Sequence, residues 1–184
     1  RNHQKSDSKQ ITDQFQTQED GYSMRCKLLG IDNLKIGKLS SQIRIWVEFS
    51  MTDSGKIIVF KSTDENRWIG QLYQYRCDVD SSNKLILRSK NVSTSNPFSG
   101  WNIFLERVKQ MGLYNLSDSG RRNNYGLCNE GGVISVEIIS NNEYFEYIYP
   151  CWDSIEDQTQ ITKIKDILQY AEEEFNFKIF PINY

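Results

Sequence analysis

Hydrophobic and polar residues alternate along several segments in the first half of the chain. The clearest case is residues 41–50, written SQIRIWVEFS, where every second residue from Ile43 to Phe49 is apolar. A period of two is typical of a β-strand with one buried face. Related patterns, separated by turn residues, predict further strands over 21–30, 56–62, 71–79 and 84–89. We therefore expect an N-terminal antiparallel meander of four or five strands.

Apolar residues recur at helical spacing in two later segments. The first stripe runs from Trp101 to Met111, with Ser99 as a candidate N-cap and Gly112 as a C-terminal stop. The second stripe runs from Ile161 to Phe175. Both segments are predicted to be amphipathic helices that pack on a sheet.

A β-hairpin is predicted between the two helices, with strands over 133–139 and 144–149. Its second strand begins the aromatic stretch EYFEYIYPCW, in which Phe145, Tyr147 and Tyr149 share one face. We expect most of these aromatic residues to pack in the core. The best candidates for binding are Tyr147, Tyr149 and Trp152, since Tyr and Trp combine apolar contact with a polar group.

These elements predict an α+β fold: an antiparallel β meander plus a C-terminal hairpin, with two amphipathic helices packed on the sheet. Residues 1–20 are polar and are interpreted as a leader or tether, and residues 21–184 as a single α+β domain. The strands form either one continuous sheet or two subdomains that meet near residue 97.

Charge and composition exclude several classes of partner. The 184 residues carry a net charge of −2, and this lack of basic excess argues against nucleic acid as a partner. No apolar run approaches the roughly 20 residues needed to span a bilayer.

Four cysteines, at positions 26, 77, 128 and 151, have no spacing typical of a zinc site. Their even number favours two disulfides over four buried thiols. Cys128 and Cys151 flank the two ends of the hairpin that should meet, which leaves Cys26 to pair with Cys77. Disulfides would place the protein in an oxidising compartment, exported to the periplasm or anchored to the cell envelope of a bacterium.

Catalytic residues are scarce. The chain's one histidine, His3, lies in the polar leader, so the folded part lacks an imidazole for a catalytic triad, a Cys–His pair or a histidine zinc site. No phosphate-binding glycine motif is present, and we expect no cofactor and no metal. The catalytic chemistry that remains open is glycan hydrolysis by a pair of carboxylates.

Two further features point to binding. Trp46 occupies the polar side of its strand beside Arg44, where either a helix of the same domain or a partner would have to cover it. Glu172, Glu173 and Glu174 lie near the C-terminal end of the last helix, against the preference of the helix dipole. They form either a solvated face or an acidic patch that attracts a basic partner.

The C-terminal half resembles uncharacterised bacterial secreted and lipoprotein-type α+β domains. The resemblance covers residues 98–180 and rests on W101-x-x-F104, on GLYNL from Gly112, on YxYP at 147–150 and on the closing EEEFNFKIF. It implies an exported domain, with no assigned activity that could be carried over.

The sequence thus favours a non-catalytic extracytoplasmic recognition protein of the immunity or inhibitor type, which binds a partner protein. A carboxylate-dependent glycan hydrolase and an envelope-anchored module that binds glycan or protein are the alternatives.

Overall fold

The structure is a computed structural model that describes residues 21–35, 40–49, 54–63, 67–117, 132–141, 143–150 and 158–179. The chain divides into two compact units, Arg1–Asn33 and Leu34–Tyr184. The polar leader, residues 1–20, lies outside the described residues.

The first unit contains a helix where a strand was expected. Helix α1 spans Gly21–Leu29 and ends at Gly30, whose φ of 65° is the left-handed conformation that often closes a helix. The backbone N–H of Ile31 donates to the carbonyl of Cys26 at 3.0 Å across this end. The prediction of a strand over 21–30 was wrong. It rested on the alternation of apolar residues and on the closing glycine, but a glycine at this point ends a helix equally well.

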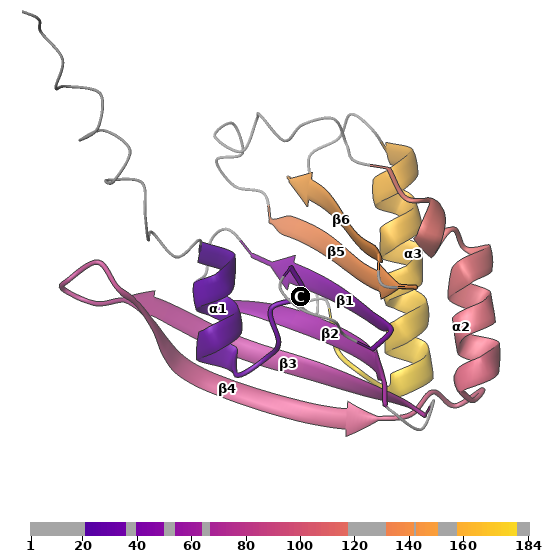
Figure 1. Cartoon of the computed structure of the whole chain (residues 1–184), viewed down its shortest axis with the longest axis horizontal. Helices are drawn as coiled ribbons and strands as arrows, with labels where there is room; N and C mark the ends of the chain where they lie inside the picture. The colour runs from indigo at the N-terminus through magenta and orange to yellow at the C-terminus, as the bar shows by residue number, and fades with distance from the viewer. Residues whose placement is uncertain are drawn as a thin grey trace, which may run out of the picture. The chain divides into compact units, whose positions relative to one another are not determined.

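The second unit is built on a six-stranded antiparallel sheet (Figure 1) with the order β4-β3-β2-β1-β5-β6. The strands are β1 (Gln42–Glu48), β2 (Ser54–Ser62), β3 (Trp68–Val79), β4 (Leu85–Ser95), β5 (Val133–Ser140) and β6 (Glu143–Pro150). Because β1 pairs with β5, the strands before and after residue 97 belong to one continuous sheet. The α+β fold and the hairpin over β5 and β6 are confirmed.

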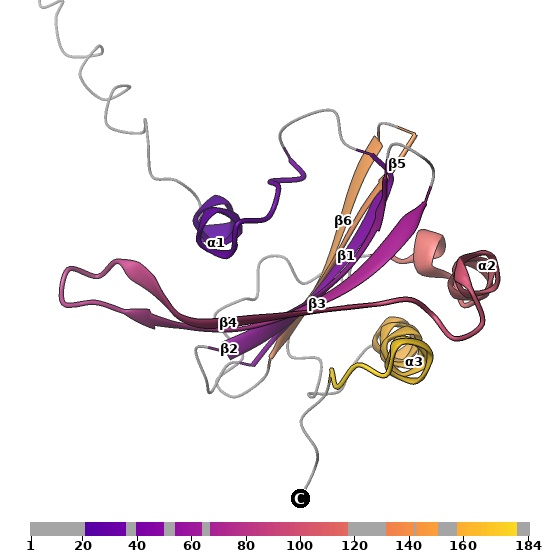
Figure 2. The same ribbon diagram turned by 90° about the horizontal axis from the view of Figure 1, so that it is seen from below.

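Helices α2 (Trp101–Gln110) and α3 (Gln158–Phe175) pack on one face of this sheet (Figure 2). Their buried residues meet alternate residues of the strands, so that the period of two in the strands and the helical stripes produce one core. This core includes Ile43, Ile45, Ile58, Phe60, Val136, Phe104, Val108, Ile164, Leu168 and Phe175. The helices cover the sheet as the amphipathic stripes predict.

One glycine allows α3 to approach the sheet closely. A Cβ atom at Gly70 of β3 would overlap the ring of Phe175 and would come within 2.9 Å of the carbonyl oxygen of Ser95. A side chain at this position would therefore push the end of α3 away from the sheet.

The cap of α2 differs from the prediction. The residue before the helix is Gly100, with φ 84°, and it makes no side-chain capping bond. Ser99 instead donates its backbone N–H and its hydroxyl to Glu174 Oε2, at 2.8 and 2.9 Å. Ser99 is thus a contact to α3 and does not cap its own helix.

The cysteine prediction is also corrected in part. Cys26 and Cys77 are both buried and are present as thiols, not as the expected disulfide. The expectation assumed that both residues lie on strands, whereas Cys26 lies on α1. Cys128 and Cys151 lie outside the described residues.

Within the described ranges, no helix combines the length and the apolar character needed to cross a bilayer.

Candidate functional site

The tyrosines of β6 fall on two faces of the sheet, as the alternation predicts. Tyr149 is fully buried on the helix side, and its hydroxyl donates to the carbonyl of Ser117 at 3.0 Å. Tyr144 lies on the opposite face, and its hydroxyl donates to Glu137 Oε1 at 2.9 Å. Both tyrosines therefore use their polar groups inside the protein.

Glu137 is the centre of a buried charge cluster on the face that α2 and α3 do not cover. It stands opposite Arg44 in the β1–β5 register, and both side chains are almost fully buried. Trp46 Nε1 donates to Glu137 Oε2 at 2.6 Å, and Arg44 Nη1 lies 3.7 Å from the same oxygen. The guanidinium carbon of Arg44 is 6.0 Å from the centre of the Trp46 ring.

The cluster is buried, and its charge acts on the neighbouring phenol of Tyr144. Burial, together with the negative charge of Glu137, raises the pKa of Tyr144, so its phenol remains a hydrogen-bond donor at neutral pH. Trp46 is 4 % exposed and Arg44 1 % exposed. The two binding candidates of β1 are therefore brought together by Glu137, but neither is accessible to a partner in this structure.

The three glutamates of α3 differ in their contacts. The Glu174 carboxylate receives both hydrogen bonds from Ser99, and the backbone N–H of Ile179 donates to Glu172 Oε1. Glu173 is exposed and accepts a bond from Gln169 at 3.2 Å. Two of the three carboxylates thus fasten neighbouring segments of the chain.

Lys56 lies near this end of α3. Its Nζ donates to the carbonyl oxygen of Lys178 at 2.8 Å. Burial lowers the pKa of Lys56, while the charge of Glu172 acts in the opposite direction. The charges here belong to an internal network that holds the segment after α3.

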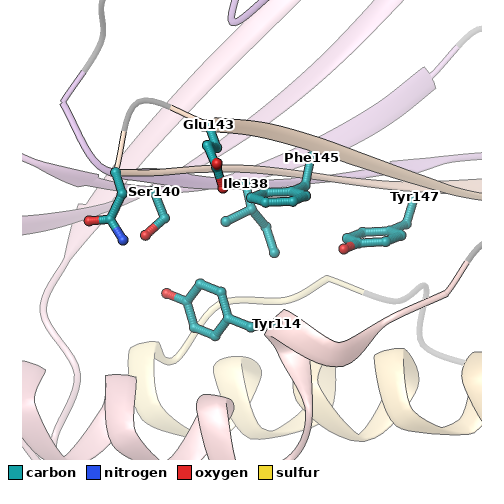
Figure 3. A pocket seen from close by; sticks show the side chains of 7 residues that line it. Tyr114, Ile138, Ser140, Glu143, Phe145 and Tyr147 are labelled. Atoms are coloured by element: carbon teal, nitrogen blue, oxygen red, sulfur yellow. The ribbon is translucent and has the colours of Figure 1, made fainter.

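An open pocket lies at the turn of the β5–β6 hairpin, with a volume of about 220 Å³. We call it the turn pocket. It is lined by seven residues: Tyr114, Ile138, Ser140, Asn141, Glu143, Phe145 and Tyr147. Ser140, Glu143, Phe145 and Tyr147 extend from the hairpin, and Tyr114 approaches from the opposite wall (Figure 3). Tyr114 and Phe145 are among the most exposed aromatic residues described, at 41 % and 40 %.

Local backbone geometry positions the two walls. Gly112, with φ 91°, ends α2 and turns the chain into the 3₁₀-helix η2 (Leu113–Asn115), in which Leu113 is buried and Tyr114 faces outward. Across the pocket, Ser140 pairs with Glu143 around a two-residue turn in which Asn141 has φ 53°. A left-handed residue at this point is typical of tight hairpin turns.

The tyrosine hydroxyls and the carboxylate of the turn pocket have no hydrogen-bond partner among the described residues. The hydroxyls of Tyr73 and Tyr75, like those of Tyr144 and Tyr149, donate to other protein groups. By contrast, no residue in the described ranges hydrogen-bonds to the hydroxyls of Tyr114 and Tyr147, and none pairs with the carboxylate of Glu143. Burial raises the pKa of Tyr114, so its phenol stays protonated at neutral pH.

The sequence indicated only part of this pocket. Tyr147 was a binding candidate, and Trp152 lies outside the described residues. The alternation of β6 places Glu143, Phe145 and Tyr147 on one face, so the sequence pattern could also have indicated Glu143 and Phe145. No sequence pattern links Tyr114 to that face, because the contact depends on how η2 folds back over the hairpin.

The described residues contain no group of three His, Cys, Asp or Glu side chains that could hold a metal ion. No protein-family model and no curated protein matches this chain.

Proposed function

We propose that the protein is a non-catalytic recognition protein of the immunity or inhibitor type, and that the turn pocket is part of the surface that binds its partner protein. One observation carries the proposal. Three aromatic side chains surround an open pocket whose two tyrosine hydroxyls and single carboxylate have no partner among the described residues. Exposed aromatic residues with available polar groups are enriched where proteins bind other proteins.

Hydrolysis of a glycan is less well supported by this site. Acid–base hydrolysis of a glycosidic bond needs two carboxylates about 5–9.5 Å apart. Glu143 is the one acidic residue among the seven that line the turn pocket. A glycan could still stack on the aromatic rings without being cleaved, so glycan binding is the alternative that the experiment must separate.

We also propose that the protein acts outside the cytoplasm. This part of the proposal rests on the predicted Cys128–Cys151 disulfide, whose two residues flank the paired hairpin ends Val133 and Pro150.

The test is affinity capture with three matched baits: the wild-type chain, Phe145→Ala and Ile103→Ala. Ile103 is an exposed apolar residue of α2, 61 % accessible, that does not line the pocket. The proposal expects a protein that the wild type and Ile103→Ala enrich and that Phe145→Ala loses. The complex must then be rebuilt from the two purified proteins, and mass spectrometry should find both chains chemically unchanged. Equal capture by all three baits would refute a binding role for the pocket.

A further inference from the structure

We propose that the turn pocket receives an arginine side chain of the partner, with the guanidinium stacked on the aromatic rings and paired with Glu143. This inference rests on the proposed function, since it assumes that a protein partner occupies the pocket. It adds the chemical class of the group that enters.

The charge of the pocket determines the sign of its occupant. Glu143 is the only charged residue among the seven that line it, and no described residue neutralises its carboxylate. A partner that closes the pocket removes water from this carboxylate. An apolar occupant would leave that loss of hydration uncompensated, and an anionic one would add repulsion. A cationic group offsets it.

The aromatic walls favour the same occupant. Tyr114 lies on one side of the opening, and Phe145 and Tyr147 lie on the other (Figure 3). The faces of aromatic rings carry negative electrostatic potential and attract cations within about 6 Å. Three rings and a carboxylate in one pocket therefore act together on a positive charge.

The polar lining distinguishes arginine from lysine. The groups of Ser140, Tyr114, Tyr147 and Glu143 present hydroxyl and carboxylate oxygens, all of which accept hydrogen bonds. A guanidinium offers five donors in a plane, and that plane also stacks on aromatic rings. An ammonium group is compact, more strongly hydrated and cannot stack. A pocket of about 220 Å³ has room for a side chain as large as arginine.

The test uses three small probes, the N-acetyl, N-methylamide derivatives of arginine, lysine and citrulline. Citrulline has nearly the shape of arginine but no charge. Binding is followed by NMR titration of the ring resonances of Tyr114, Phe145 and Tyr147. We expect arginine to bind about tenfold more tightly than citrulline and more tightly than lysine.

Glu143→Gln should lower the ratio of arginine to citrulline affinity severalfold, because only the attraction of the aromatic rings for the cation then remains. Glu106→Gln, which removes an exposed carboxylate from α2 outside the pocket, should leave the ratio unchanged. Equal affinities for arginine and citrulline in the wild type would overturn the inference. Tighter binding of lysine, or a ratio that Glu143→Gln leaves unchanged, would do the same.

The outcomes separate this inference from the proposed function. If the captured partner depends on Phe145 but binds Glu143→Gln as well as it binds the wild type, the pocket recognises a partner without an arginine. If capture does not depend on Phe145, the proposed function itself fails. A partner that loses binding both to Glu143→Gln and after substitution of one of its own exposed arginines would support both proposals.

Discussion

Glu174 explains an apparent conflict between charge and helix dipole. An acidic residue near the C-terminus of α3 is disfavoured by the dipole of that helix. Its carboxylate, however, accepts two hydrogen bonds from Ser99, which lies just before the N-terminus of α2. The positive end of one helix dipole therefore offsets the negative end of the other, and the residue joins the two helices.

This contact predicts a specific response to acid. Burial would raise the pKa of Glu174, but the hydrogen bonds from Ser99 and from Tyr170 outweigh it and hold the pKa below its ordinary value of 4.5. The contribution to stability is therefore present above pH 4.5 and is lost as the pH falls through the folded-state pKa. Glu174→Gln should unfold more easily by about 1 kcal/mol at neutral pH.

The measurement is urea unfolding of the wild type and of Glu174→Gln between about pH 6 and about pH 3. The difference in free energy of unfolding should shrink as the pH is lowered. A difference that stays constant over this range would show that the charge of Glu174 does not stabilise the fold.

Glu137 should be the most costly carboxylate to remove. Glu137→Ala would leave the guanidinium of Arg44 buried without its counter-charge, and we expect a loss of about 3 kcal/mol in the free energy of unfolding. Glu106→Ala, at an exposed position on α2, serves as the matched control. The double variant Arg44→Met, Glu137→Leu should recover part of the loss, because no unpaired charge is then buried, although Trp46 and Tyr144 still lack their acceptor. Equal losses of stability in Glu137→Ala and Glu106→Ala would contradict a structural role for the cluster.

The packing of α3 on β3 yields a further prediction. Gly70→Ala should destabilise the protein by about 1–3 kcal/mol, since the new methyl group meets both the Phe175 ring and the Ser95 carbonyl. In the double variant Gly70→Ala, Phe175→Leu, the second substitution relieves the contact of the new methyl group with the ring but not its contact with the Ser95 carbonyl. The cost of the double variant, measured by thermal unfolding, should be less than the sum of the two single costs. Strict additivity would show that the glycine and the ring do not share one site.

Several elements could be predicted because their sequence patterns have a single interpretation. Strand β1 has clear alternation, β2, β5 and β6 are rich in β-branched or aromatic residues, and the stripes of α2 and α3 have helical spacing. The segment of α1 was misread because Tyr22, Met24, Cys26 and Leu28 also alternate. Strand β4 extends to Ser95, beyond the end that the sequence predicted. The extension was missed because residues 88–94 are exposed and carry no hydrophobic pattern.

The site was less predictable than the fold, for a topological reason. Tyr147 and Tyr149 share a face of β6, but one lines an open pocket and the other is fully buried. What separates them is the segment that packs over each, namely η2 at the turn end of the hairpin and the chain near Ser117 at the other end. A strand pattern shows on which face of the sheet a residue lies, but not which segment of the chain packs over that residue.

Among the described residues, two sets of charged and aromatic side chains differ in their hydrogen bonding. One group has its polar atoms engaged internally, as in the Glu137 cluster and in the contact between Glu174 and Ser99. The other group, at the turn pocket, presents similar side chains whose hydroxyls and carboxylate have no described partner. This difference in hydrogen bonding, and not the number of aromatic residues, distinguishes the proposed binding surface from the core.

The proposal that the protein acts outside the cytoplasm depends on the oxidation state of its cysteines. Cys26 and Cys77 are buried thiols, so the argument for an oxidising compartment now depends on Cys128 and Cys151 alone. The β5–β6 register pairs Val133 with Pro150, the strand residues nearest to those two cysteines in the sequence. We expect protein purified without reductant to show two reactive thiols after denaturation, which are the four cysteines less the bridged pair. Peptide mapping should place these thiols at Cys26 and Cys77. Four reactive thiols would remove the basis for export, and none would contradict the thiols of the structure.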